Sequence, residues 1–383
     1  MAALSAGHLA VDFAGGALPA LLPFLVDKYD LSYTLAAVIM LASALSASVV
    51  QPIFGLWSDR RGAYWLIPAG VAIGGIGMAV AAAAPAYWLV LVFVVVSGLG
   101  TAAYHPEGSK FAAYLSGRKR ASGMSVFSIG GNLGYGLGAL ATTPLVLWLG
   151  LRGGLLLAVP CLAVGAVLVA LSRYLGSFVP DRREHAARAG EDRPEAMTLL
   201  LLVILFRNLS WFGLLTFVPL WEVSQGHSKS YGTHLLALML LAGGVGTLAA
   251  GPIADRIGRR PVMLVSSLVS PGLVLVFLLV GGVPGAVALA LNGAAVIGTF
   301  GVTMVMGQEY LPRRIGLASG LVTGFAFGLG GIAAVVLGAV ADAVDLRTAL
   351  LISAASPVVA LVFTALLPPS SARRALAPEV VTP

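Results

Sequence analysis

Two ionisable residues lie four positions apart in an otherwise apolar stretch, GHLAVDFAGGALPALLPFL, which starts at Gly7. In a helix, His8 and Asp12 lie on one face, one turn apart. An imidazole and a carboxylate at this spacing can take up and release a proton together in the physiological pH range. Asp12 is the stronger candidate for this proton chemistry, because it lies deeper in the apolar stretch.

A second pair of ionisable residues flanks a proline in the segment GTAAYHPEGSKFAA. His105 and Glu107 enclose Pro106, which in a helix leaves one backbone carbonyl without its usual partner and bends the axis. These two side chains are candidates for the same proton chemistry. The alternative is that the segment is the start of a polar loop, because Lys110 follows shortly afterwards.

Arg207 interrupts the apolar run LLLLVILFRNLSWFGLL and needs a negatively charged partner. A guanidinium offers two parallel hydrogen bonds to a phosphonate or a carboxylate, so Arg207 is a candidate for binding an anionic substrate. The alternative is a structural ion pair with Glu309 or Asp12.

Four further residues are expected to contribute to the substrate site, namely Asn132, Trp211, Gln308 and Glu309. Each has a structural alternative. Asn132 can instead hydrogen-bond a neighbouring helix, Glu309 can cap a helix end, and Trp211 can face lipid.

The composition identifies the elements that must position these side chains as membrane helices. Of the 383 residues, 58% are hydrophobic and only 10% are charged, whereas soluble domains carry about 25% charged residues. The single cysteine, Cys161, excludes an intramolecular disulfide and a multi-cysteine metal site. In hydrocarbon every ionisable side chain is costly, so His8 and Asp12 either face the protein interior or lie near the membrane surface and bond a neighbouring helix.

Apolar runs between charged or turn-forming clusters predict twelve spans. They are expected near residues 3–26, 32–57, 63–84, 86–113, 121–149, 153–173, 197–222, 232–254, 261–282, 285–308, 315–341 and 347–367. Of the 23 Lys and Arg residues, 18 then fall on the side of the N-terminus. Four fall on the other side, and Arg207 lies within a span. Because basic loops stay in the cytoplasm, both termini are predicted to be cytoplasmic.

The chain contains an internal repeat. GLWSDRRGAY (55–64) and GPIADRIGRR (251–260) share the pattern G-x-x-x-D-R-x-G at an offset of 196, and the triplet ASG recurs at 121–123 and 318–320, an offset of 197. A duplicated six-helix unit with a site between the copies is typical of secondary transporters.

This repeat predicts the domain organisation. We expect an N-terminal six-helix half, a charged flexible linker, a C-terminal six-helix half and a cytoplasmic tail, at residues 1–173, 174–196, 197–368 and 369–383. In the fifth span Gly130, Gly134 and Gly138 form a stripe that predicts close packing against another helix.

The repeated loop motif resembles that of the major facilitator superfamily, and the resemblance covers the whole chain. The segments GHLAVDFAGGALPALLPFL, GTAAYHPEGSKFAA and ASGMSVFSIGGNLGYGLG resemble the fosmidomycin-resistance branch of that superfamily. That branch is thought to export drugs or organic anions in exchange for protons.

The resemblance implies that the two loop motifs form a latch between the halves, with Gly55, Asp59, Arg60 and Gly62 in the first copy and Gly251, Asp255, Arg256 and Arg259 in the second. The first copy departs from the pattern, because Ala63 and Tyr64 replace the trailing basic pair. The resemblance also implies that spans one and four line a central cavity. His105 and Glu107 would then join His8 and Asp12 in a four-residue cluster.

We therefore predict an all-α membrane protein of the inner membrane that exports a small drug-like or organic-anion substrate, such as a phosphonate antibiotic, by proton antiport. Its partners would be the substrate, protons and the lipid bilayer; no cofactor, metal or nucleic acid is expected, and both halves in one chain favour a monomer. A proton-coupled importer or a uniporter is the main alternative, because the sequence does not fix direction. An intramembrane enzyme would need a nucleophile or metal motif that the sequence lacks.

Overall fold

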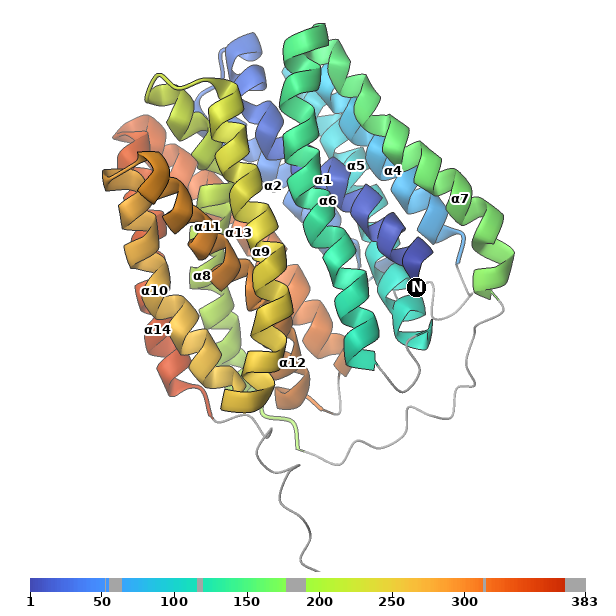
Figure 1. Cartoon of the computed structure of the whole chain (residues 1–383), viewed down its shortest axis with the longest axis vertical. Coiled ribbons are helices and arrows are strands. Elements are labelled where there is room, and N and C mark those ends of the chain that lie inside the picture. The colour runs from blue at the N-terminus through green and yellow to red at the C-terminus, as the bar shows by residue number, and fades with distance from the viewer. Residues whose placement is uncertain (52, 55–63, 116–119, 177–190, 313–314, 369–383) are drawn as a thin grey trace, which may run out of the picture.

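The computed structural model describes residues 1–51, 53–54, 64–115, 120–176, 191–312 and 315–368, and within these ranges the chain is helical throughout with no strand (Figure 1). The helices run alternately between two faces of one bundle. We call the face that holds Met1, Gly176 and Pro194 the N-terminal face, and the opposite face the distal face.

Each half of the chain supplies six spans. The N-terminal half consists of α1 (Ala2–Tyr29), α2 (Tyr33–Val49), α4 (Leu66–Ala83), α5 (Tyr87–Leu115), α6 (Arg120–Leu149) and the 3₁₀ turn η1 (Gly150–Leu157), which continues into α7 (Ala158–Gly176). The C-terminal half consists of α8 (Pro194–Ser224), α9 (Lys229–Ile257), α10 (Arg259–Leu279), α11 (Gly282–Gly298), α12 (Phe300–Tyr310), α13 (Ile315–Ala343) and α14 (Leu346–Leu366).

The predicted all-helical membrane fold is confirmed. In the described part of the chain, ten apolar helical stretches are long enough to cross a membrane, one of which (126–172) contains both α6 and α7, and α2 adds a shorter apolar helix. These make up the twelve predicted spans. Large apolar side chains also cover the outside of the bundle, as Trp148 (79% exposed) and Val283 (77%) illustrate, which suits contact with lipid.

Two predicted elements differ in detail, and one alternative is excluded. The tenth span is not one helix, because Thr299 separates α11 from α12. The segment around Pro106 is helical, so the alternative of a polar loop there is wrong. Helix α7 extends to Gly176 and α8 begins at Pro194, inside the predicted linker, and residues 177–190 lie outside the described part.

Polar caps on the distal face end the helices where the sequence changes character. The side chains of Ser32 and Ser228 accept hydrogen bonds from the first turns of α2 and α9. Asp345 does the same for α14, and the hydrogen bond from the Thr348 backbone N–H holds the pKa of the Asp345 carboxyl below its usual value. The short loops keep consecutive helices antiparallel.

The halves contact one another mainly along two helix pairs, α2 with α13 and α6 with α9, and α1 also contacts α8 and α9. Figure 1 shows α6 and α9 side by side at the centre of the bundle. Within the N-terminal half, α1 packs along the length of α6. These contacts place α1, α5 and α6 around the residues that the sequence singled out.

Candidate functional site

A carboxylate lies between two imidazoles in the N-terminal half. Asp12 and His8 lie on one face of α1, and α5 brings His105 to the same carboxylate. The His8 Nε2 atom is 3.3 Å from Asp12 Oδ2, and the His105 Nε2 atom is 3.4 Å from Asp12 Oδ1. His8 and Asp12 are buried, each 9% exposed. We call His8, Asp12 and His105 the acid–imidazole cluster.

Backbone carbonyls fix the orientation of both imidazoles. The Nδ1 atom of His8 is 2.8 Å from the Phe127 carbonyl oxygen, and the Nδ1 atom of His105 is 2.9 Å from the Thr101 carbonyl oxygen. Because a carbonyl only accepts hydrogen bonds, Nδ1 carries a proton in each ring. Both Nε2 atoms therefore face the carboxylate.

Aromatic rings pack around the histidines. The His8 ring stacks on Phe127 with centroids 4.2 Å apart, and it meets His105 edge-on at 5.0 Å. Tyr104, which is fully buried, stacks against His8 on another side and donates its hydroxyl to the Leu4 carbonyl. These contacts hold the rings in one orientation.

Glycines on α6 let α1 approach closely. A Cβ at Gly130, Gly134 or Gly138 would lie 2.2, 2.3 or 2.0 Å from the backbone oxygen of Ser5, Leu9 or Phe13, respectively. A fourth glycine, Gly131, faces the cluster: a Cβ there would lie 2.5 Å from His8 Nε2 and 2.6 Å from Asp12 Oδ2. The glycines thus set both the helix spacing and the room that the cluster occupies.

Glu107, the fourth predicted member of the cluster, lies elsewhere. Its buried carboxylate accepts a hydrogen bond from Lys110 Nζ at 3.0 Å, one turn further along α5. Residues 105 and 107 are only two positions apart, so on a helix their side chains point in different directions. The structure therefore groups three of the four predicted residues and pairs the fourth with a lysine.

Arg207, on α8, is buried inside the C-terminal half, and its side chain reaches α10, α11 and the break after α11. Its guanidinium donates to Ser266 Oγ at 3.0 Å, to Ser267 Oγ at 3.1 Å and to the Val296 carbonyl at 3.2 Å, and also to Thr299 Oγ1. The partners that the structure describes for Arg207 are thus neutral, so the predicted alternative of an ion pair with Glu309 or Asp12 is not observed.

The remaining candidates for the substrate site are dispersed. Asn132 donates to Thr247 Oγ1 at 3.2 Å, which links α6 to α9 across the halves. Trp211 is partly buried against the apolar core, and Gln308 is partly buried near the end of α12. Glu309 pairs with Arg259.

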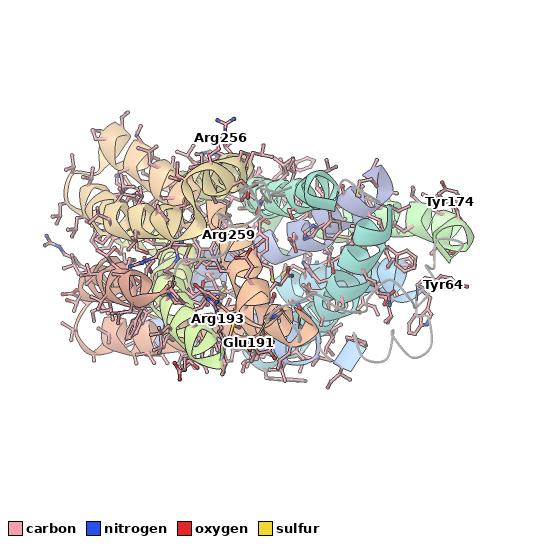
Figure 2. All side chains as sticks on the ribbon, turned by 90° about the horizontal axis from the view of Figure 1, so that it is seen from below. Tyr64, Tyr174, Glu191, Arg193, Arg256 and Arg259 are labelled. Atoms are coloured by element: carbon pink, nitrogen blue, oxygen red, sulfur yellow. The ribbon has the colours of Figure 1, made fainter. Side chains whose placement is uncertain are left out.

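The second copy of the loop motif lies on the N-terminal face. Arg259, at the start of α10, binds the carboxylate of Glu309 at the end of α12, whereas Asp255 and Arg256 are exposed. Figure 2 shows Arg256 projecting from the edge of this face. Gly251 has open space around it. The first copy, with Gly55, Asp59, Arg60 and Gly62, lies outside the described residues, so its predicted latch contacts remain a prediction.

Several contacts join the two halves at the distal face. The Asp342 carboxylate, on α13, accepts hydrogen bonds from the backbone N–H groups of Tyr33 and Thr34 at 2.8 and 2.9 Å, at the start of α2. Lys229 of α9 pairs with Asp27 of α1. We call these contacts the distal closure.

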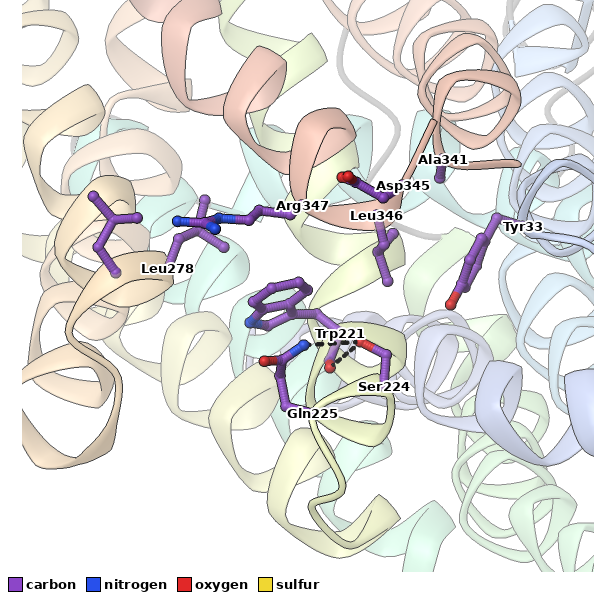
Figure 3. A pocket seen from close by; sticks show the side chains of 10 residues that line it. Tyr33, Trp221, Ser224, Gln225, Leu278, Ala341, Asp345, Leu346 and Arg347 are labelled. Carbon is purple, nitrogen blue, oxygen red and sulfur yellow. Dashed lines mark hydrogen bonds between the residues drawn. The ribbon is translucent and has the colours of Figure 1, made fainter. Parts of the chain in front are cut away.

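An open pocket of about 640 Å³ lies beside the distal closure, mostly in the C-terminal half. In Figure 3, Asp345 and Arg347 lie across the pocket from Trp221, Ser224 and Gln225. Its lining includes no member of the acid–imidazole cluster, so the pocket is separate from that site.

Sequence reasoning missed three residues that the structure places at these sites: Gly131, Tyr104 and Thr299. Gly131 carried a signal, because it lies off the Gly130, Gly134, Gly138 face and packing of that face does not explain it. Thr299, at the break between α11 and α12, and Tyr104 carried none.

Comparisons with known proteins agree on one family. A model of the Major Facilitator Superfamily matches residues 4–335 and, in a second match, residues 200–381. The chain is 32% identical over 369 residues to the "Uncharacterized MFS-type transporter YfnC" of Bacillus subtilis (strain 168), covering 92% of this chain and 88% of that protein. It is 28% identical over 358 residues to the "Fosmidomycin resistance protein" of Escherichia coli (strain K12), covering 89% and 86%.

Solved transporter structures share the fold. A bacterial homologue of the human lysosomal transporter Spinster, in an inward-facing and occupied conformation, superposes with a TM-score of 0.74 at 16% identity, covering 97% of this chain and 96% of that one. The nucleoside transporter NupG gives 0.74 at 15% identity, covering 96% and 99%. FucP in its outward conformation gives 0.67 at 17% identity, covering 96% and 98%.

Proposed function

Because the chain belongs to the Major Facilitator Superfamily, we propose that it is a proton-coupled exporter of a small drug-like or organic-anion compound, such as a phosphonate antibiotic, and that it works by alternating access. It is a multi-pass membrane transporter and not an enzyme. Proton coupling, direction and substrate are the proposed part. Both termini are taken to be cytoplasmic, so the distal face is external.

One observation carries the proton coupling: each oxygen of the Asp12 carboxylate faces the Nε2 atom of a different imidazole, at 3.3 and 3.4 Å. With Nδ1 already protonated, each Nε2 would otherwise direct its lone pair at a carboxylate oxygen, which is repulsive. A proton between each pair of atoms removes the repulsion. The cluster can therefore hold up to two protons, and its charge changes from −1 to +1 as they bind.

That change in charge can drive a change in conformation. A net charge in a buried site costs several kcal/mol unless it is paired or solvated. This is roughly the cost of placing an ionised side chain within a bilayer. The protonated and deprotonated clusters therefore favour different exposure to water. Among the described residues, Tyr104 on α5, Tyr135 on α6, which packs against Gly15 of α1, and Cys161, which donates to the Ala10 carbonyl, are other titratable groups near the cluster.

The substrate class rests on a relative and on a charge. The Escherichia coli relative is named for resistance to fosmidomycin. Arg207 supplies a buried positive charge whose described partners are neutral, and an anionic substrate within the bundle would compensate it. In this proposal Arg207 acts through its field rather than by a direct contact, because hydroxyl and carbonyl groups already accept hydrogen bonds from both of its terminal nitrogens.

The conformational cycle would use contacts at both faces. The distal closure would hold the external side shut and would break when the transporter opens outward. The repeated loop motif, including the Arg259–Glu309 pair, would act as the latch at the cytoplasmic face. The tightly packed α1 and α6 would move as one unit.

The test is transport of fosmidomycin, used as the probe, by purified protein in liposomes with an imposed pH gradient. We expect the gradient to accelerate transport by the wild-type protein and to have no effect on Asp12→Asn, with a reduced effect on His105→Ala. Glu222→Gln is the matched control, because Glu222 is a buried carboxylate paired with His227 at the other end of the molecule.

Three outcomes would contradict parts of this proposal. Wild-type transport that ignores the pH gradient would exclude proton coupling. Coupling that survives in Asp12→Asn and fails in Glu222→Gln would move the proton site to the distal end. Fosmidomycin that neither binds nor moves would exclude this substrate, and a screen of other organic anions and cationic drugs would follow.

A further inference from the structure

We propose that the acid–imidazole cluster is also a binding site for one divalent transition-metal ion of the Zn²⁺ class, with His8, Asp12 and His105 as its three protein ligands. This contradicts our sequence-based expectation of no metal site. It depends on the geometry of three side chains and not on the proposed transport activity.

The spacing of the ligand atoms fits a tetrahedral ion. Zinc binds imidazole nitrogen and carboxylate oxygen at about 2.0–2.2 Å, so two ligand atoms on one tetrahedron are about 3.3–3.5 Å apart. His8 Nε2 lies 3.3 Å from Asp12 Oδ2 and His105 Nε2 lies 3.4 Å from Asp12 Oδ1, so each imidazole is at this distance from one of the two oxygens of the same carboxylate. One ligand atom from each of the three residues can be chosen so that all lie within 4.8 Å of one another.

The imidazoles are oriented as metal ligands are. A metal-binding histidine almost always donates its other ring N–H to a carbonyl or a carboxylate, which fixes the tautomer and aims the free nitrogen at the ion. His8 and His105 both do this, through Phe127 and Thr101. A cation between the two Nε2 atoms and the carboxylate would satisfy every lone pair that these atoms direct at one another.

The composition of the ligand set selects the class of ion. Two imidazole nitrogens and one carboxylate suit Zn²⁺ and other first-row transition ions such as Fe²⁺ or Ni²⁺, whereas Mg²⁺ and Ca²⁺ prefer sites made of oxygen atoms. Three protein ligands leave a fourth position for water or another small ligand. The His105 side chain is 27% exposed, against 11% for His8, so that position is most accessible beside His105.

The sequence conceals this site because its ligands come from distant helices. Asp12 and His105 are 93 positions apart, and the pair His8 and Asp12 alone supplies only two ligands. The resemblance predicted that His105 joins His8 and Asp12, but only the packing of α1, α5 and α6 shows that both Nε2 atoms face the carboxylate, with room left at Gly131.

The inference is tested by titrating the purified protein with Co²⁺, which reports tetrahedral nitrogen and oxygen ligands by its visible absorption, and then displacing it with Zn²⁺. The protein is purified in detergent with an affinity tag that contains no histidine. We expect one saturable Co²⁺ per chain. Asp12→Asn, His8→Asn and His105→Asn should each weaken binding by at least about tenfold, the scale already seen when only the outer shell of a metal site is lost.

Two histidines outside the cluster provide matched controls. His234→Ala removes an exposed histidine, and His227→Ala removes the imidazole that pairs with Glu222. Both variants should bind Co²⁺ as the wild-type protein does. Gly131→Ala gives an independent readout, because its Cβ would intrude between His8 and Asp12 and should weaken Co²⁺ binding while all three ligands remain.

The proposal is overturned if the wild-type protein shows no saturable Co²⁺ spectrum, or if all three ligand variants that elute as folded protein keep full affinity. Loss of binding in His227→Ala alone would place the ion at the Glu222–His227 pair and also overturn it. Metal binding in a protein whose transport ignores the pH gradient would refute the proposed function and leave this inference standing.

Discussion

In the N-terminal half, α1 and α5 hold a carboxylate between two imidazoles, whereas in the C-terminal half α8, the counterpart of α1, carries a guanidinium held by hydroxyl and carbonyl groups. The charge of the first site depends on how many protons or ions it holds. The charge of the second is permanent, because arginine stays protonated in proteins. The duplication has therefore kept the scaffold while assigning variable charge to one half and fixed charge to the other.

The glycines of the two halves differ in the same way. Gly131 and its repeat counterpart Gly328 lie 197 positions apart. A Cβ at Gly131 would collide with His8 and Asp12, whereas a Cβ at Gly328 would lie 3.4 Å from Ser48 Oγ, on α2 of the other half. The same sequence position serves a buried site in one half and the contact between halves in the other.

The largest predicted effect is a difference in transport between two glycine-to-alanine substitutions, one at Gly131 and one at Gly328. Gly131→Ala should reduce gradient-driven transport by on the order of tenfold or more, because small misplacements of reacting groups cost this much. Gly328→Ala should leave transport nearly unchanged, because its methyl group makes an ordinary contact. Fosmidomycin transport in liposomes measures both, and equal effects of the two substitutions would mean that Gly131 has no special relation to the cluster.

A smaller effect, on the stability of the protein, is expected when the permanent charge of Arg207 is removed. Arg207→Met should lower the stability of the protein by about 1.5–3 kcal/mol, the range for hydrogen bonds to charged groups, since it removes the donor shared by Ser266, Ser267 and Thr299. Thermal unfolding in detergent measures this as a fall in Tm. The residual transport should still respond to the pH gradient.

Arg256→Met is the matched control for this change, because Arg256 is exposed and should alter stability by less than about 0.5 kcal/mol. If Arg207→Met kept its Tm but lost binding of the probe, Arg207 would contact the substrate directly. The contrast between a structural charge in one half and a reactive site in the other would then be wrong.

The contact between the halves at Asp342 should have a more modest effect. Asp342→Ala leaves two N–H groups of α2 without their acceptor, and losing a helix cap costs about 1 kcal/mol. This energy corresponds to a change of about fivefold in the ratio of closed to open distal faces. Spin labels on Asp30→Cys and Val283→Cys, which are exposed on opposite halves, report that balance as a distance distribution. An unchanged distribution would show that Asp342 does not hold the halves together.

The smallest effect is predicted for the neighbouring ion pair. Lys229→Ala should change the free-energy difference between the closed and open distal faces by only about 0.2–1 kcal/mol, because Asp27 is exposed and water screens the pair. The same distance distribution reports this change. High salt should reduce the difference from the wild-type protein. The charge reversal of Asp27→Lys with Lys229→Asp should restore the wild-type distribution, and failure to do so would assign the effect of Lys229 to its contact with the Phe24 ring.

The sequence predicted the spans and the repeat well, because hydropathy and helical period act over many residues and local errors average out. It placed His8 and Asp12 together for the same reason: both lie on one helix, and one turn fixes their spacing. The helix break at Thr299 escaped prediction because no proline or charge marks it.

Contacts between helices were harder to predict. His105 and Glu107 looked equivalent along the chain, and only the rotation of α5 against α1 separates them. Arg207 was expected to have an anionic partner, but its described partners are two serines of α10, a backbone carbonyl of α11 and Thr299. Serines are too common in membrane helices to signal such a role.

Helix α5 is continuous through Pro106, but the proline has no backbone N–H for the carbonyl one turn earlier, so the helix bends more easily at this point. The His105 imidazole is hydrogen-bonded to the Thr101 carbonyl on the distal side of the proline, whereas Glu107 and Lys110 lie on the other side. Bending at the proline can thus move the Glu107–Lys110 end of α5 while His105 stays beside Asp12. One end of α5 can therefore move while the other end stays attached to α1 through His105 and Asp12.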